Sequence, residues 1–211
     1  MTMLIAVKFD NSIIMTADKR VTTTNGFDRI LKVESDEYKK IKIINKKYVI
    51  SFAGRIFIAE KAFDFIDQKS DILNSNIDPL LFFREAFNYG KSCFEAYHSG
   101  ITPLSVFFVG YIKPDEGPQL LGFSSDDNYT GLEIDSSIKI NSNSPDHEDM
   151  LISETVNFIT KEMSNRHAYY HSNEKLLEIY AQAIKRTNDP MIGKTTYSVV
   201  LTSTGAEEYH H

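Results

Sequence analysis

Short apolar runs separated by polar turns dominate the first quarter of the chain. Asn and Asp tolerate the backbone of tight turns, so two apolar runs joined by such residues predict a β-hairpin. Two hairpins are expected on this basis: Leu4–Phe9 with Ile13–Ala17 around Asp10-Asn11-Ser12, and Ile41–Ile44 with Tyr48–Phe52 around Asn45-Lys46-Lys47. The polar segment Thr22–Glu37 between them predicts a loop or an extended excursion.

Apolar residues then recur every three or four positions, which is the spacing of a helix with one buried face. Four helices are expected in two pairs: Ile56–Ile66, a helix that begins at Asp78-Pro79, one that begins at Ser144-Pro145, and one about Glu174–Lys185. The buried faces are expected to include Leu80, Phe83, Phe87, Phe94 and Tyr97 in the second helix, Ile152, Val156, Ile159 and Met163 in the third, and Leu177, Tyr180 and Ile184 in the fourth.

Strand spacing returns between the helix pairs and after the last helix. The expected strands are Leu104–Tyr111, Gln119–Phe123, two shorter runs near Asn128–Leu132 and Ser137–Ile140, and a last strand Thr196–Ser203. Sheets inside a domain need cover, and two stacked sheets with a helix pair on each outer side provide it. The order therefore predicts an α+β fold, a four-layer α-β-β-α sandwich of two antiparallel sheets. Helix count alone does not separate it from another α+β arrangement.

Composition narrows the class of protein. The chain has 211 residues, of which 42% are hydrophobic, and it shows no repeat or linker, so one domain over 1–211 is expected. A net charge of -6 and a pI near 5.5 argue against nucleic-acid binding. The single Cys93 excludes an internal disulfide and fits a reducing compartment. No apolar run approaches the roughly 20 residues that span a bilayer. These features predict a cytoplasmic protein without a membrane partner.

Candidate chemistry begins at Thr2, which becomes the first residue once Met1 is removed. A threonine with a free α-amine carries a nucleophile and a proton acceptor on one residue, which suits amide cleavage. Asp18 lies sixteen positions further on, and Lys40 follows in Tyr38-Lys39-Lys40-Ile41. Taken singly, Asp18 and Arg20 suggest a structural ion pair and Lys40 suggests a solvated turn residue.

Taken together, these residues resemble the proteasome β-subunit family of N-terminal-nucleophile threonine hydrolases. That family opens with a threonine, two apolar strands around a turn, and an Ala-Asp-x-Arg pattern, which corresponds here to Ala17-Asp18-Lys19-Arg20. An Ala-Gly pair fourteen residues after the lysine corresponds to Ala53-Gly54. The similarity is strongest over the first third of the chain and is traceable to about Ser203.

Two later segments resemble the family less closely. Its Gly-Ser-Gly-Ser turn corresponds to Asn141-Ser142-Asn143-Ser144, and its Asp-x-x-Ser-Gly pattern to Asp189-Pro190-Met191-Ile192-Gly193. Ile192 stands where the family has a serine, and Thr22–Glu37 is six residues longer than the family pattern.

The resemblance implies an N-terminal-nucleophile hydrolase fold and a role for each matched residue. The Thr2 hydroxyl would attack the substrate carbonyl, beside an ammonium of Lys40 that Asp18 holds in place. Ser142 and Asp189 would hold the Thr2 amine and a water, and the Gly54 N–H would bind the oxyanion. The specificity pocket would have apolar walls, formed by Val21, Tyr38, Phe52 and Ile56. No metal and no cofactor are expected.

The expected function is therefore that of a threonine-type peptidase in a self-assembled homo-oligomer, a ring or a helical assembly. Peptides or unfolded proteins would be the substrates, and an ATPase unfoldase is a possible partner. Two alternatives stay open on the same fold: a catalytically silent scaffold, because Ile192 removes a hydroxyl near the amine, and a small-molecule amidase.

Overall fold

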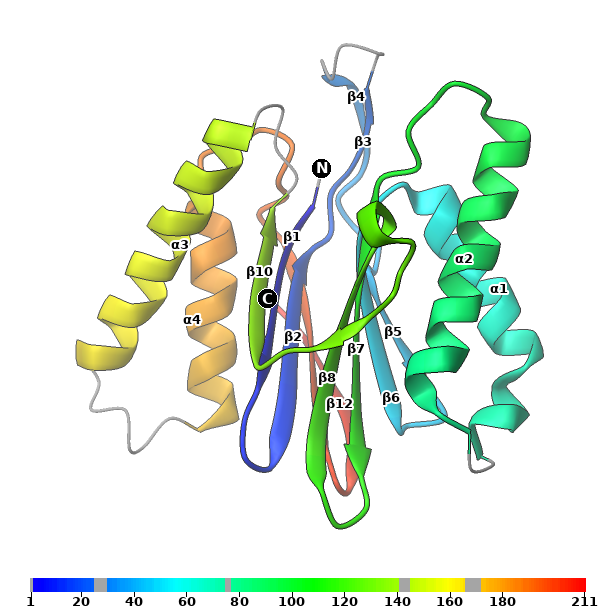
Figure 1. Cartoon of the computed structure of the whole chain (residues 1–211). Helices are drawn as coiled ribbons and strands as arrows, with labels where there is room; N and C mark the ends of the chain where they lie inside the picture. Colours follow the sequence, from blue (N-terminus) through cyan, green and yellow to red (C-terminus); the bar gives the residue numbers. More distant parts are fainter. Residues whose placement is uncertain (1, 25–29, 75–76, 141–144, 166–171) are drawn as a thin grey trace.

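The computed structural model describes residues 2–24, 30–74, 77–140, 145–165 and 172–211. Within these ranges the chain forms a mixed α+β structure with antiparallel sheets and four α-helices (Figure 1). The helices form two consecutive pairs, α1 (Ile56–Gln68) with α2 (Pro79–Tyr97) and α3 (Pro145–Asn165) with α4 (Asn173–Arg186). The α+β class and the two helix pairs are thus confirmed. Across the described ranges, the helices are too short or too polar to cross a membrane.

Two five-stranded sheets carry most of the strands, and neighbouring strands in both are antiparallel. The first sheet has the order β10-β1-β2-β11-β12, with β1 Met3–Lys8, β2 Ser12–Asp18, β10 Ser136–Ile140, β11 Thr196–Thr202 and β12 Gly205–His210. The second has the order β5-β6-β7-β8-β9, with β5 Ile41–Ile44, β6 Tyr48–Gly54, β7 Ser105–Lys113, β8 Gly117–Ser124 and β9 Leu132–Glu133. Both hairpins expected near the N-terminus are confirmed as β1–β2 and β5–β6.

Each sheet buries both of its faces, because successive side chains along a strand point to opposite sides. In β2, Ile14 packs in an apolar cluster with Leu177 of α4, whereas Met15 belongs to a second cluster that lies between the two sheets. The other sheet packs against α1 and α2 through aromatic rings, and Phe87 stacks on Phe107 with ring centroids 3.9 Å apart. Figure 1 shows the two helix pairs on the outer sides of the two sheets. The packing is compatible with the four-layer order that the sequence predicts.

The segment between the two N-terminal hairpins forms a small ladder of its own. Of the two alternatives expected for this segment, the extended excursion holds for β3 (Val21–Thr24) and β4 (Ile30–Ser35), which pair as a separate antiparallel sheet beyond the end of β2 (Figure 1). β-branched Val and Thr residues favour extended backbone even where the segment is polar. The residues between these strands lie outside the described ranges.

Three other expectations need correction. The chain continues after β11 into β12, which the sequence analysis missed because its exposed Glu207 and Glu208 break the apolar pattern. Tyr97 and Val156 are 77% and 45% exposed, so they are not on the buried faces of their helices. The run near Asn128–Leu132 is mainly a turn, and only its last residue enters β9.

Candidate functional site

A buried carboxylate at one end of the sandwich organises the residues that the sequence analysis singled out. Asp18 is the last residue of β2 and is 0% exposed. Its Oδ1 accepts hydrogen bonds from the Met3 main-chain N–H at 2.8 Å and from the Lys40 ammonium at 2.9 Å. Its Oδ2 accepts from the main-chain N–H groups of Arg20 and Gly193, both at 3.0 Å. Four donors from four parts of the chain therefore converge on one side chain.

Lys40 reaches Asp18 from the residue just before β5. The main-chain N–H of Tyr38 donates to the Lys19 carbonyl at 3.1 Å, and the Phe52 N–H donates to the Lys40 carbonyl at 3.1 Å. The segment before β5 therefore crosses from the end of β2 to β6. The Lys40 side chain is 2% exposed, and its burial lowers the pKa of the ammonium, while the neighbouring Asp18 carboxylate opposes that shift.

Thr2 directly precedes β1 and is 3% exposed. The Met3 N–H and the Lys40 ammonium donate to the same oxygen of Asp18. The distance between these two nitrogens therefore cannot exceed the sum of the two hydrogen-bond lengths. The peptide that links Thr2 to Met3 is thus held beside the ammonium. The structure brings Thr2, Asp18 and Lys40 to one place, although they come from three different segments.

Arg20 ties the same end of the molecule together in a way that the sequence did not indicate. Its guanidinium binds Asp36 in a forked pair, with Nε to Oδ1 at 2.7 Å and Nη2 to Oδ2 at 3.0 Å, and these bonds lower the pKa of Asp36. Its third nitrogen, Nη1, donates to the Pro190 carbonyl at 2.8 Å. The side chain of Arg20 therefore pairs with Asp36, and only its main-chain N–H serves Asp18.

The Gly193 backbone lies tightly against Arg20. A Cβ atom on Gly193 would lie 2.9 Å from the Arg20 Cβ and 3.0 Å from the Arg20 nitrogen. Glycine is thus required here for close approach of two backbone segments.

The segment that carries Asp189 packs beside the start of β1. The Thr187 hydroxyl lies 3.2 Å from the Met3 sulfur, and Ile192 is fully buried in the same apolar cluster as Met3. Asp189 is buried as well: its Oδ1 accepts from the Met191 N–H at 2.7 Å, and its Oδ2 lies 3.4 Å from Nε2 of His147. Ser142, expected to hold the amine, lies outside the described residues.

Gly54 ends β6 at the same end of the sandwich, opposite Ser105 of β7. Its φ of +112° suits glycine alone, and a Cβ there would lie 2.3 Å from the Leu104 carbonyl oxygen. The backbone at the glycine of the Ala53-Gly54 pair therefore favours glycine over any residue with a side chain. Whether its N–H binds an oxyanion stays a prediction.

The four residues expected to form the pocket wall are only partly brought together. Tyr38, Phe52 and Ile56 share the apolar cluster beneath α1 and α2, and the Tyr38 and Phe52 rings meet edge to face at 6.2 Å. Phe52 is 0% exposed, so it forms part of the core rather than an open surface. Val21 instead begins β3, where it pairs with Ser35.

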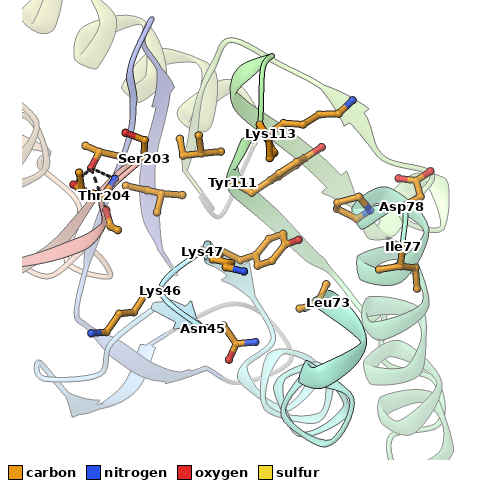
Figure 2. A pocket seen from close by; sticks show the side chains of 17 residues that line it. Asn45, Lys46, Lys47, Leu73, Ile77, Asp78, Tyr111, Lys113, Ser203 and Thr204 are labelled. Atoms are coloured by element: carbon orange, nitrogen blue, oxygen red, sulfur yellow. Dashed lines mark hydrogen bonds between the residues drawn. The ribbon is translucent and has the colours of Figure 1, made fainter. Parts of the chain in front are cut away.

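A hollow of about 1130 Å³ lies at the opposite end of the sandwich and does not include any of the expected site residues. It is lined by the β5–β6 turn, the end of β7, the β11–β12 turn and the start of α2, as Figure 2 shows. Lys46, Lys47 and Lys113 surround it together with Tyr111 and Asp78. The groups that surround Asp18 and this groove are therefore separate features of the molecule.

Sequence reasoning missed three polar groups at the Asp18 end of the molecule: Asp36, His147 and the Gly193 N–H. For His147 the sequence offers one signal, since it is a polar residue at the start of a helix, next to the expected serine turn.

Over the residues that the structure describes, groups of three or more His, Cys, Asp and Glu side chains able to hold a metal ion are absent. Comparison with models of known protein families and with curated protein sequences gives no match.

Proposed function

We propose that this chain is a threonine-type peptidase whose N-terminal nucleophile is Thr2, exposed by removal of Met1. One observation carries the proposal: a single oxygen of buried Asp18 binds both the main chain next to Thr2 and the Lys40 ammonium. Taking two charges out of water is costly, and buried ionisable groups that lie together mark candidate functional sites.

The chemistry follows from the properties of these groups. Lys40, as an ammonium held near the Thr2–Met3 peptide, would stabilise the negative charge that develops as the Thr2 hydroxyl loses its proton. Asp18 fixes the ammonium and the start of β1 together. The α-amine of Thr2, with an ordinary pKa of about 7.7–8.0, carries the proton, and the Gly54 N–H stabilises the oxyanion.

The arrangement of layers supports an N-terminal-nucleophile hydrolase fold for this function. Helix pairs cover the outer faces of two stacked sheets (Figure 1), and Asp18, with the donors around it, lies where β2 ends. Following the resemblance, the enzyme acts on peptides or unfolded proteins within a homo-oligomer, with an ATPase unfoldase as a possible partner. Light scattering on the purified protein measures the number of subunits.

The test combines mass spectrometry with kinetics. Intact mass first establishes that Met1 is absent, and a peptide epoxyketone should then add to the chain, since its ring closure needs both the hydroxyl and the amine of Thr2. Thr2→Ala should reduce peptide cleavage at least about a thousandfold, whereas Thr2→Ser retains part of it. Thr23→Ala, an exposed threonine of β3, is the matched control and should leave cleavage unchanged. Full activity in Thr2→Ala would remove the mechanism.

Neighbouring lysines provide a second matched pair. Lys40→Met should lower kcat about a hundredfold or more, because it removes the charge beside the nucleophile. Lys39→Met changes a half-exposed lysine that binds Glu208 and should leave kcat within about twofold. Equal effects of the two substitutions would contradict the assigned role of Lys40.

A catalytically silent scaffold on the same fold is the second candidate. Two observations favour it: Thr2 is only 3% exposed, and fully buried Ile192 takes the place of a hydroxyl. Absence of an epoxyketone adduct on chains that have lost Met1 would decide for the scaffold.

A further inference from the structure

Asp189 lies against a histidine from another element of the chain. Its side chain is 6% exposed, and one oxygen is occupied by the Met191 N–H two residues away. The other oxygen faces Nε2 of His147 at 3.4 Å. A carboxylate offers about four acceptor positions, so Asp189 can bind His147 and still accept from another donor.

His147 comes from a different element, the first turn of α3. Its side chain is 37% exposed, so one edge of the ring meets water while Nε2 points to the buried carboxylate. The acidic neighbours on its own turn are Asp146 and Glu148, and Glu148 is engaged by Lys139 of β10. From the opposing segment, the Lys194 ammonium donates to the Thr187 carbonyl. The Asp189 carboxylate is the acidic group that this segment presents to the ring.

Ile192 explains why such a donor matters. It lies three residues after Asp189, is fully buried in the cluster that contains Met3, and has no hydrogen-bonding group in its side chain. A buried carboxylate needs hydrogen-bond donors to stay in a fixed orientation. His147 places a ring nitrogen 3.4 Å from this carboxylate from outside the segment, whereas the Ile192 side chain has no donor to offer.

We propose that His147 is a positioning residue for the N-terminal threonine site: its Nε2–H holds the Asp189 carboxylate in the orientation that receives the Thr2 amine. The assignment rests on the proposed function. It requires the neutral ring to carry its proton on Nε2, or the ring to be protonated. His147 does not touch the substrate and acts through Asp189.

Kinetics of three variants test the role. His147→Leu should lower kcat about tenfold with KM within about twofold, since the contact bears on the reacting amine and not on substrate binding. His147→Gln, which keeps an N–H donor, should recover most of that loss. His210→Leu, an exposed histidine of β12, is the control and should match the wild type. A wild-type kcat in His147→Leu, or an equal loss in His147→Leu and His147→Gln, would overturn the proposal.

Nitrogen NMR of the His147 ring separates this proposal from the proposed function. The ring should carry its proton on Nε2 in the wild type and lose that preference in Asp189→Asn. If the wild-type enzyme is inactive and forms no epoxyketone adduct but the ring responds to Asp189→Asn, the proposed function fails while the contact stands. If the enzyme is active and the ring does not respond, the contact and the role of His147 both fail.

Discussion

The two ends of the sandwich use polar groups in opposite ways. Where β1 begins, Asp18 and Lys40 are almost completely buried and their partners come from distant parts of the chain. At the other end, exposed Lys46 and Lys47 line an open groove and face water. A buried charge must have partners in fixed positions, whereas an exposed lysine contributes little to stability. The contrast shows that this groove and the buried Asp18–Lys40 pair lie at different ends of the molecule.

The largest expected effect comes from removing the buried carboxylate. Asp18→Ala leaves the Lys40 ammonium without this partner and three main-chain N–H groups without this acceptor, so it should lower the free energy of unfolding by about 3–5 kcal/mol. Asp78→Ala is the matched change at the groove end. Asp78 caps α2 by accepting the Leu80 N–H, and its loss should cost about 1 kcal/mol. Urea unfolding followed by circular dichroism measures both, and equal losses would erase the contrast between the ends.

A glycine pair tests how tightly the site end is packed. Gly193→Ala should lower the free energy of unfolding by about 1–3 kcal/mol, because its methyl group meets the Arg20 backbone. Gly122→Ala in β8 is the control, since its Cβ would lie 3.4 Å from the end of the Ile134 side chain. That variant should stay within about 0.5 kcal/mol of the wild type. Similar thermal unfolding of both variants would show that the site end is no tighter than the middle of a strand.

The groove end should instead tolerate a stabilising substitution. Lys46 has a left-handed backbone with φ of 57°, next to Asn45 with φ of 51°, as in the hairpin turn that favours Asn-Gly. Lys46→Gly should therefore raise the free energy of unfolding by about 0.5–1 kcal/mol. Lys47→Gly, at a position without positive φ, should lower it. Denaturant titration of the two variants gives the signs, and a loss in Lys46→Gly would refute this account of the turn.

The smallest expected difference between the two ends is in how the free energy of unfolding depends on alkaline pH. Burial, with help from Glu60, raises the pKa of Tyr38 to about 12, and burial raises the pKa of Tyr48 in the groove. An unfolded tyrosine loses its proton near pH 10. Between about pH 10 and 12 the folded chain binds more protons than the unfolded one, so the free energy of unfolding falls as the pH rises. Tyr38→Phe should flatten that decline more than Tyr48→Phe, and the reverse order in pH-dependent melts would contradict it.

The elements that sequence reasoning predicted well carry their own local signals. Asp10-Asn11-Ser12 and Asn45-Lys46-Lys47 separate apolar runs at both N-terminal hairpins, and Asp78-Pro79 begins α2 at the expected place. Turn and cap preferences act within a few residues, so a single chain displays them. β12 carries no apolar run of this kind, since the adjacent and exposed Glu207 and Glu208 interrupt the alternation along this edge strand.

The site was predictable only as far as the resemblance reached. Spacing from Thr2 suggested Asp18 and Lys40, and the structure brings these two side chains together. The forked pair of Arg20 with Asp36, the Gly193 N–H and the His147 contact join residues that lie 16, 175 and 42 positions apart in the chain. Such contacts depend on how the segments pack, which local pattern does not encode.

The bond between Asp18 and Gly193 also sets the order in which the molecule can mature during translation. Asp18 leaves the ribosome early with β2, whereas Gly193 follows 175 residues later. Chains fold from the N-terminus as they are made. Until Gly193 has been synthesised, Oδ2 of Asp18 in the first hairpin therefore lacks one of its hydrogen-bond donors. Closing so long a loop belongs to the late steps of folding. The set of hydrogen bonds to the Asp18 carboxylate is thereby completed only once Gly193 has been synthesised, and a product that stops before Gly193 would lack this bond.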